Sequence, residues 1–225
     1  LGFILGGCAS RTPKVMQLEI VEPEEPERLL WPQLPEVPRY RYAGQLLGEA
    51  NFRSPKEEPS GVAQALAWLA GLLAGEGNLV ELQRPQSGTV DAFGRIYVAD
   101  SGRGAVFVFD PVAGELNIWD KAVGMLNFVN PVGVAIGPRG EVLVTDAQLG
   151  FVTRLDAKGD SLGVIGRGML KRPTGLAYDP QGKRIYVSDT YDHDIKVFDD
   201  DGQLVKTIGH RGEGEGEFNF PTHLA

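Results

Sequence analysis

Short apolar stretches that alternate with polar residues recur three times in the second half of the chain. Residues 96–114 read IYVADSGRGAVFVFDPVAG, residues 142–159 read VLVTDAQLGFVTRLDAKG, and residues 185–202 read IYVSDTYDHDIKVFDDDG. Alternation with a period of two, interrupted by Gly, Asp and Pro, predicts half-buried β-strands joined by tight turns. In the last copy we expect four strands, at 175–179, 184–190, 194–200 and 204–209.

Two other features recur in step with this pattern. Pro131, Pro173 and Pro221 open the segments PVGVA, PTGLA and PTHLA. Each copy also carries two aspartates that are ten residues apart, at 100/110, 146/156 and 189/199. Four short antiparallel strands in a repeat of about 45 residues are the sequence pattern of a β-propeller blade. The predicted fold class is therefore all-β, with about three four-stranded blades between residues 85 and 225.

The repeated motif, P-x-G-[VL]-A followed by V-[AST]-D and an alternation ending in [FL]-D, resembles the NHL repeat. Residues 189–199 are the closest copy and place His193 at the usual histidine position, whereas the second copy has no histidine and Asp194 stands where the family often has Arg. Residues 208–221 are similar to the family's connector between blades. The resemblance implies a propeller of usually six blades. We therefore expect this chain, which lacks an initiator Met and ends inside a unit, to be part of a longer protein.

The first residues suggest how the protein is placed in a cell. Residues 1–8, LGFILGGC, are apolar but far shorter than the ~20 residues that cross a bilayer. They resemble the end of a lipoprotein signal peptide, which implies cleavage before Cys8 and lipidation of its thiol. Ala9 after the cysteine implies sorting to the outer membrane of a Gram-negative envelope, facing the periplasm or the surface. The alternative is a free cytosolic cysteine after a chance apolar stretch.

The segment between this motif and the repeats has two expected parts. Residues 9–39 are rich in proline and glutamate, which predicts an extended acidic tether that is either a plain spacer or a recognition segment. Residues 40–84 are expected to hold one lone strand (40–46), a polar loop (48–59) and an amphipathic helix (60–75) that packs on the domain. A membrane-surface helix is disfavoured because the polar face has no Lys or Arg.

Composition and motifs exclude several kinds of chemistry. The net charge of −8 and the lack of a basic stripe disfavour nucleic-acid partners, although some NHL domains bind RNA. The single cysteine excludes an intrachain disulfide, and no G-x-S-x-G, P-loop or C-x-x-C motif occurs. The aspartates at 100, 146 and 189 recur in every copy, which favours a structural role in binding backbone N–H groups. His193, His210 and His223 lack metal-site spacing, and the glycine-rich stretch 212–217 suits a connector better than a calcium site, so we expect no metal and no cofactor.

Topology indicates where a partner would bind. In an up-and-down blade, the turn between the second and third strands lies at the same end as the connector to the next blade. Recognition often uses such loops on a rigid scaffold, although these could also be plain solvated loop ends. The candidate binding face comprises Arg103, Gln148, Arg167, Lys171, Arg172, Tyr191, His193, His210 and Arg211.

These inferences together predict an NHL-type propeller lipoprotein of the cell envelope that acts as a scaffold for a protein or a small ligand. It is expected to have no catalytic residues and to meet the membrane only through its lipid anchor. The alternative is a metal-dependent propeller enzyme, a lactonase- or esterase-like hydrolase or a lyase, with its metal in the central channel. Such a metal would need polar ligands on the first strands, which are mostly apolar or small here.

Overall fold

The structure, a computed structural model, describes residues 14–19, 30–33, 35–53 and 79–224. Contacts within the chain divide it into two units, one of residues 1–81 with 113–115, the other of residues 82–112 with 116–225. Each unit is described separately below. The segment with the predicted lipidation site Cys8, most of the predicted tether and the expected helix at 60–75 lie outside the described residues.

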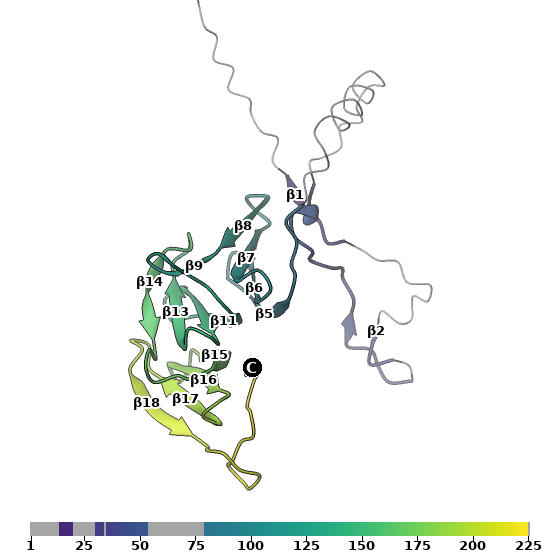
Figure 1. Cartoon of the computed structure of the whole chain (residues 1–225). Helices are drawn as coiled ribbons and strands as arrows, with labels where there is room; N and C mark the ends of the chain where they lie inside the picture. Colours follow the sequence, from purple (N-terminus) through teal and green to yellow (C-terminus); the bar gives the residue numbers. More distant parts are fainter. Residues whose placement is uncertain (1–13, 20–29, 34, 54–78, 225) are drawn as a thin grey trace, which may run out of the picture. The chain divides into compact units, whose positions relative to one another are not determined.

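The larger unit consists of four-stranded antiparallel sheets in which each strand pairs with its neighbour in sequence (Figure 1). The first sheet contains β5 (Pro85–Val90), β6 (Ile96–Asp100), β7 (Ala105–Asp110) and β8 (Glu115–Trp119). The second contains β11 (Pro131–Ile136), β12 (Val142–Asp146), β13 (Phe151–Leu155) and β14 (Ser161–Ile165). The third contains β15 (Pro173–Asp179), β16 (Arg184–Asp189), β17 (Asp194–Phe198) and β18 (Leu204–Ile208). The predicted all-β class and the three blades are confirmed.

The blades lie side by side, with their first strands β5, β11 and β15 adjacent to one another (Figure 1). The connector from the first blade to the second adds a short hairpin of β9 (Lys121–Val123) and β10 (Leu126–Asn127). The expected strands of the third blade differ from the observed ones by only a few residues at their ends. At Asp199, for example, the third strand has already given way to a turn, because the carboxylate accepts hydrogen bonds from Asp201 N and Gln203 N.

The register of the strands is the same in each blade. Tyr97, Leu143 and Tyr186 occupy equivalent positions, paired with Val108, Arg154 and Val197. This equivalence confirms the repeat assignment made from the sequence. It also allows any residue of one turn to be compared with its counterpart in the other two blades.

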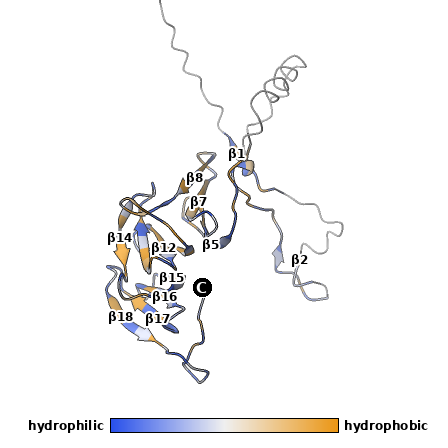
Figure 2. Cartoon of the chain, in the orientation of Figure 1, coloured by the Kyte–Doolittle hydropathy of each residue, from blue (hydrophilic) through white to orange (hydrophobic). Residues whose placement is uncertain are grey.

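The hydrophobic core lies between neighbouring blades. Tyr97 of the first blade packs in one cluster with Val142, Val144 and Leu155 of the second. Leu143, on the opposite face of the second blade, packs in another cluster that includes Phe198. Apolar side chains therefore line both faces of the second blade. In Figure 2, where the ribbon is coloured by hydropathy, β14 of this blade is largely orange, the colour of hydrophobic residues. A blade of this kind is stable only when both faces are covered, which explains why the unit is repeated.

The described residues of the smaller unit form only short elements. β1 (Val15–Met16) pairs with β4 (Phe52–Arg53), β2 (Leu30–Trp31) pairs with β3 (Tyr40–Arg41), and the 3₁₀ helix η2 spans Glu49–Asn51. The prediction of a lone strand at 40–46 is therefore wrong, and part of the predicted loop at 48–59 is ordered. Two-residue strands carry too little alternation to be seen in a sequence.

A buried asparagine organises these short elements. Asn51 is 1% exposed, and its side-chain carbonyl accepts hydrogen bonds from Leu47 N and Gly48 N. Its amide group donates to Gln17 O and Gln45 O. One side chain thus satisfies four backbone groups, one at Gln17 and three between residues 45 and 48, which offsets the shortness of the strands. The described part of the chain contains no helix with the length and apolar character needed to span a bilayer.

Candidate functional site

The turns between the second and third strands share one end of the blades with the connectors between blades. Each blade has a buried aspartate at this end. We call this the connector end; it comprises the turns 101–104, 147–150 and 190–193 and the connectors 82–84, 120–130, 166–172 and 209–220. Asp146 accepts hydrogen bonds from Val129 N and Asn130 N of the connector and from Gln148 N and Leu149 N of the turn. Asp100 binds its connector and turn in the same way, and Asp189 accepts from Lys171 N and Arg172 N.

These three carboxylates are fully buried. A buried carboxylate is stable only when its oxygens accept several hydrogen bonds, and backbone N–H groups supply them here. The structural role predicted for the recurring aspartates is therefore confirmed. Its consequence for function is that the loops of the connector end are held in fixed positions, as a recognition surface requires.

The turn of the third blade, residues 190–193, is held by connectors on both sides. Thr190 N donates to Arg172 O of the connector that precedes the blade, while Thr190 Oγ1 donates to Pro221 O beyond the connector that follows it. The Arg172 guanidinium lies 5.0 Å from the centre of the Tyr191 ring and donates to its hydroxyl at 3.2 Å. This turn is the most extensively bonded part of the candidate face.

His193 differs from its counterparts in the other blades. All three residues have a left-handed backbone, with φ of 59° at Gly104, 71° at Gly150 and 57° at His193. A Cβ at Gly104 or Gly150 would lie 3.0 Å from a carbonyl oxygen of the adjacent connector, that of Phe128 or Leu170. Side chains are therefore disfavoured there both by backbone conformation and by space. In the third blade the position accepts an imidazole.

The His193 imidazole is used inside the fold. The residue is 7% exposed, its Nδ1 accepts a hydrogen bond from Phe220 N, and its ring lies 4.3 Å from the Phe220 ring. The expectation that His193 presents an exposed side chain is therefore wrong. Its left-handed turn directs the ring toward the connector rather than toward solvent.

A buried lysine lies beneath the same turn. The Lys196 ammonium is 2.9 Å from Asp194, 3.0 Å from Asp192 and 3.2 Å from Asp189, and its side chain is 8% exposed. Burial alone would lower the pKa of Lys196, but the bonds to Asp194 and Asp192 and the charge of Asp189 outweigh burial and raise it. Asp192 also forms an ion pair with Lys171. Burial would raise the pKa of Asp192, but its two lysine partners lower it.

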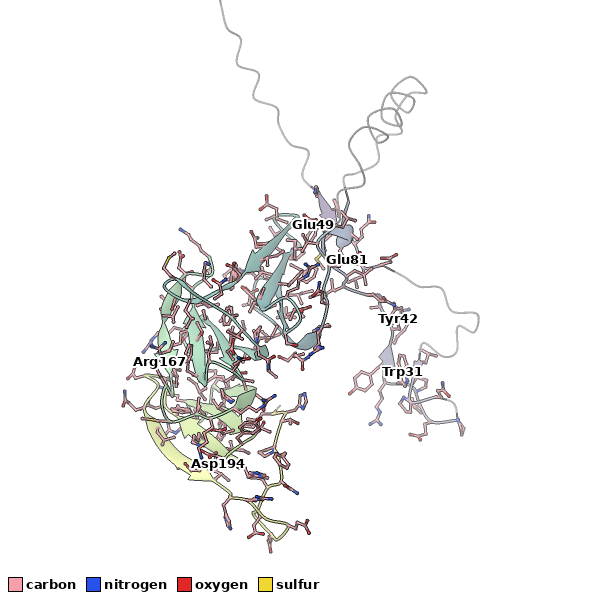
Figure 3. All side chains as sticks on the ribbon, in the orientation of Figure 1. Trp31, Tyr42, Glu49, Glu81, Arg167 and Asp194 are labelled. Carbon is pink, nitrogen blue, oxygen red and sulfur yellow. The ribbon has the colours of Figure 1, made fainter. Side chains whose placement is uncertain are left out.

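Seven of the nine predicted face residues are exposed and Arg172 is partly exposed, which leaves His193 as the buried member. Arg167, labelled in Figure 3, lies on the connector between the second and third blades with its guanidinium 4.5 Å above the Phe151 ring. His210 Nε2 lies 3.0 Å from Glu217 within the following connector. The structure thus joins Arg172 to Tyr191 and Lys171 to Asp192 of the same turn, while Arg167 lies on the preceding connector against Phe151.

Two exposed apolar residues of the connector end are not in the candidate binding face predicted from the sequence. Met169 is 52% exposed and Phe220 is 53% exposed, although both are apolar. In a sequence, an apolar residue in a connector is expected to cover the core. The available signal was that each stands beside glycine, charged or amide residues in a stretch without alternation.

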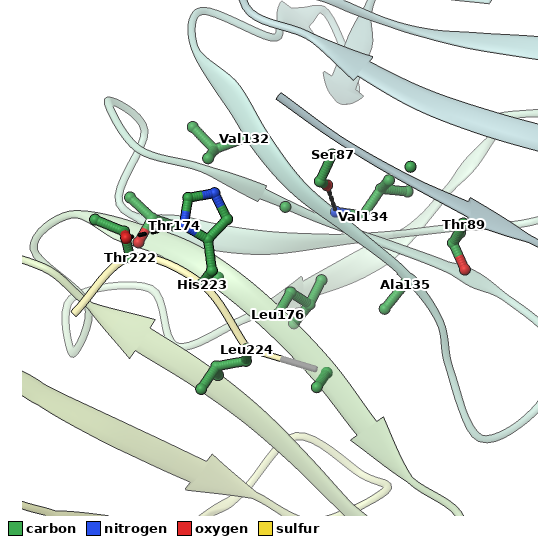
Figure 4. Close-up of a pocket in the computed structure, with 14 residues that line it drawn as sticks. Ser87, Thr89, Val132, Val134, Ala135, Thr174, Leu176, Thr222, His223 and Leu224 are labelled. Carbon is green, nitrogen blue, oxygen red and sulfur yellow. Dashed lines mark hydrogen bonds between the residues drawn. The ribbon is translucent and has the colours of Figure 1, made fainter. Parts of the chain in front are cut away.

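A hollow lies along the first strands of the blades. Its volume is about 270 Å³, and it is lined by residues that include Ser87, Thr89, Thr174, Leu176 and His223 (Figure 4). His223 Nδ1 is 2.9 Å from Thr222 Oγ1, and Ser87 Oγ accepts a hydrogen bond from Val134 N. Among the described residues, no group of three or more His, Cys, Asp or Glu is arranged to hold a metal ion. The hollow offers hydroxyls, backbone groups and one imidazole.

Comparisons with known proteins agree with this architecture. A family model described as a 6-bladed beta-propeller matches residues 178–225. The solved structure of virginiamycin B lyase from Staphylococcus aureus is 17% identical, with a TM-score of 0.50 over 62% of this chain and 44% of the lyase chain. The chain is a β-propeller. Hydrazine synthase from Kuenenia stuttgartiensis is 19% identical to this propeller, with a TM-score of 0.50 over 66% of this chain and 41% of that one.

These likenesses concern the fold. The propeller chain spans less than half the length of either solved chain. No curated protein sequence matches it. Its function must therefore be argued from the residues that its own surfaces present.

Proposed function

We propose that this protein is an envelope-anchored propeller that binds a partner through its connector end. The observation that carries the proposal is the way the turn 190–193 is held. Hydrogen bonds from Thr190 tie it to the segments on both sides, and buried carboxylates beneath it fix the backbone. Exposed Arg and Tyr side chains on fixed loops can bind without losing much conformational freedom, which favours affinity.

The proposed anchor rests on Cys8 and the acidic tether. A lipid on Cys8 would hold the protein at the membrane, and residues 9–39 would let the propeller stand away from it. A single acyl chain binds a membrane only weakly. A lipoprotein cysteine carries both a thioether-linked lipid and an amide-linked acyl chain, and together these would attach the protein stably. We propose the outer membrane as the location because Ala9 follows the cysteine.

The test of the binding proposal compares two ends of the same blades. Replacing Arg167, Arg172 and Tyr191 together by alanine removes two cations and one aromatic ring from the connector end. A matched variant replaces Lys158, Lys183 and Phe93, two cations and one aromatic ring in turns at the opposite end. Both variants and the wild-type protein would be used to capture partners from solubilised envelope, with captured bands quantified.

We expect the connector-end variant to lose a band that the wild type and the matched variant both retain, with unchanged circular dichroism for all three. Equal loss in both variants, or loss in neither, would contradict the proposal. The enzyme alternative is tested on the same preparations by measuring bound metal after purification without chelator. One tightly held metal per chain, together with hydrolase or lyase turnover that chelation removes, would replace the binding proposal.

A further inference from the structure

Three large apolar side chains at the connector end of the third blade are exposed to solvent. Met169, Tyr191 and Phe220 are 52%, 58% and 53% exposed, and they come from the preceding connector, the turn and the following connector. Scattered single apolar residues on a surface are ordinary, but Phe220 packs on His193 of the same turn that carries Tyr191. Methionine and aromatic residues are enriched in protein interfaces, where Tyr often contributes a large share of the binding energy.

Phe220 is held in this position at a cost. Its φ is 55°, a left-handed conformation that residues other than glycine rarely adopt. The conformation is stabilised by the hydrogen bond from Phe220 N to His193 Nδ1 and by the contact between the two rings. His193 is itself left-handed, so two strained residues support each other and leave half of the phenylalanine exposed. Backbone strain of this kind concentrates at functional positions.

Two arginines lie on the connector that also carries Met169. Arg167 lies on the Phe151 ring, and Arg172 lies on the Tyr191 ring with a hydrogen bond to its hydroxyl. Neither has a carboxylate partner among the described residues, whereas other arginines of the blades, Arg95, Arg139 and Arg154, form ion pairs. An aromatic ring orients a guanidinium but leaves its N–H groups available for a carboxylate.

We propose that the connector end binds an acidic segment of a partner protein in which carboxylate side chains lie next to an apolar one. The carboxylates would bind Arg167 and Arg172, and the apolar side chain would pack on Tyr191, Met169 or Phe220. This inference rests on the proposed function and specifies its ligand. A protein segment is favoured over a nucleic acid because exposed Met and Phe add nothing to phosphate binding and because the chain has a net charge of −8.

The experiment selects ligands without assuming a partner. A random-peptide library is displayed and selected on the immobilised full-length protein, and the enriched peptides are sequenced. We expect enrichment of Asp and Glu beside Leu, Ile or Phe. The best peptide is then labelled, and its affinity is measured by fluorescence anisotropy for the wild type and for single variants.

Arg167→Ala and Arg172→Ala should each weaken binding about tenfold, the usual effect of removing a central interface arginine. Replacing Glu by Gln in the peptide should have the same effect, and added salt should weaken the wild-type interaction. Tyr191→Phe keeps the ring and the cation contact, so it should change the affinity by less than about threefold. The variants Lys158→Ala and Lys183→Ala at the opposite end serve as charge-matched controls.

The possible outcomes separate the two proposals. If neutral or basic peptides are enriched and the arginine variants abolish their binding, the connector end is a binding face but its ligand is not acidic. If acidic peptides are enriched and the opposite-end controls weaken them as much as the arginine variants do, both proposals fail. Enrichment of no peptide, with strong retention of single-stranded nucleic acid or anionic vesicles by the same protein, would also overturn the inference.

Discussion

Replacing Lys196 by methionine is a direct test of how the third blade is held together. The substitution removes a cation that contacts Asp189, Asp192 and Asp194 at once, while a methionine preserves most of the aliphatic packing. Asp189 is fully buried and the other two carboxylates are 22% and 12% exposed, so water can compensate only in part. The variant therefore leaves Asp189 and Asp194 close together without the ammonium that neutralises them, while Asp192 keeps Lys171 as a partner.

The expected magnitude follows from this geometry. Removing one partner of a buried ion pair usually costs about 3–5 kcal/mol, because the remaining charge stays buried. Asp189 keeps its bonds from Lys171 N and Arg172 N, and Asp192 keeps its ion pair with Lys171. We therefore expect a loss of about 3 kcal/mol in the free energy of unfolding at neutral pH, at the lower end of that range.

The pH dependence gives a second, independent signature. In the wild type the pKa of Asp192 is lowered, so its contribution to stability is present above about pH 4 and is lost as the pH falls through the folded-state pKa. The pKa of Lys196 is raised, so its contribution is present below about pH 10 and is lost as the pH rises through the folded-state pKa. Without Lys196, Asp192 keeps only Lys171 as a partner that lowers its pKa, so the variant should lose less stability than the wild type as the pH falls below about 4.

Urea unfolding followed by far-ultraviolet circular dichroism at pH 7 and at about pH 3 measures both effects. The difference between the wild type and Lys196→Met should shrink at the acidic pH, because the wild type loses the contribution of Asp192 there. Adding Asp194→Ala and using Phe at position 196, the residues that the first blade has at these places, should recover much of the stability. A loss below about 1 kcal/mol at pH 7, or a difference that does not change with pH, would refute the account of the cluster.

Two further predictions concern other levels of the structure. Gly150→Ala should destabilise the fold by about 1–3 kcal/mol, because it combines a left-handed backbone with a Cβ 3.0 Å from Leu170 O. Gly140→Ala, at φ 77° with open space around it, is the control for the cost of the backbone conformation alone. Equal losses of stability for the two variants in thermal denaturation would exclude the steric effect. Full-length protein expressed in a Gram-negative bacterium should incorporate labelled palmitate, and Cys8→Ala should abolish the label; unlabelled, soluble wild-type protein would reject the anchor.

The sequence predicted the larger unit well because each blade carries its own signals. The period-two alternation, the turn residues and the constant aspartate spacing all describe local structure that each repeat completes within about 45 residues. Asn51 was missed because its four bonds join backbone segments separated in sequence, and an Asn in a polar stretch is typical of a loop. Lys196 was missed because a lysine within IKVFDD is usually on the solvent face. Its burial depends on Asp192 and Asp194, which neutralise it.

A comparison of the three blades indicates which differences concern recognition. All three use a buried aspartate to bind the backbone of the preceding connector, so this part of the scaffold is constant. In the turn itself, the first blade has Gly and Arg where the third has Tyr191 and Asp192, and both other blades have Gly where the third has His193. The third blade therefore contains a strained turn and a buried ion cluster. Both cost stability, and the equivalent positions of the other two blades have neither. Because its neighbours show that the fold does not require these residues, their presence in the third blade supports the proposal that a partner binds at this turn.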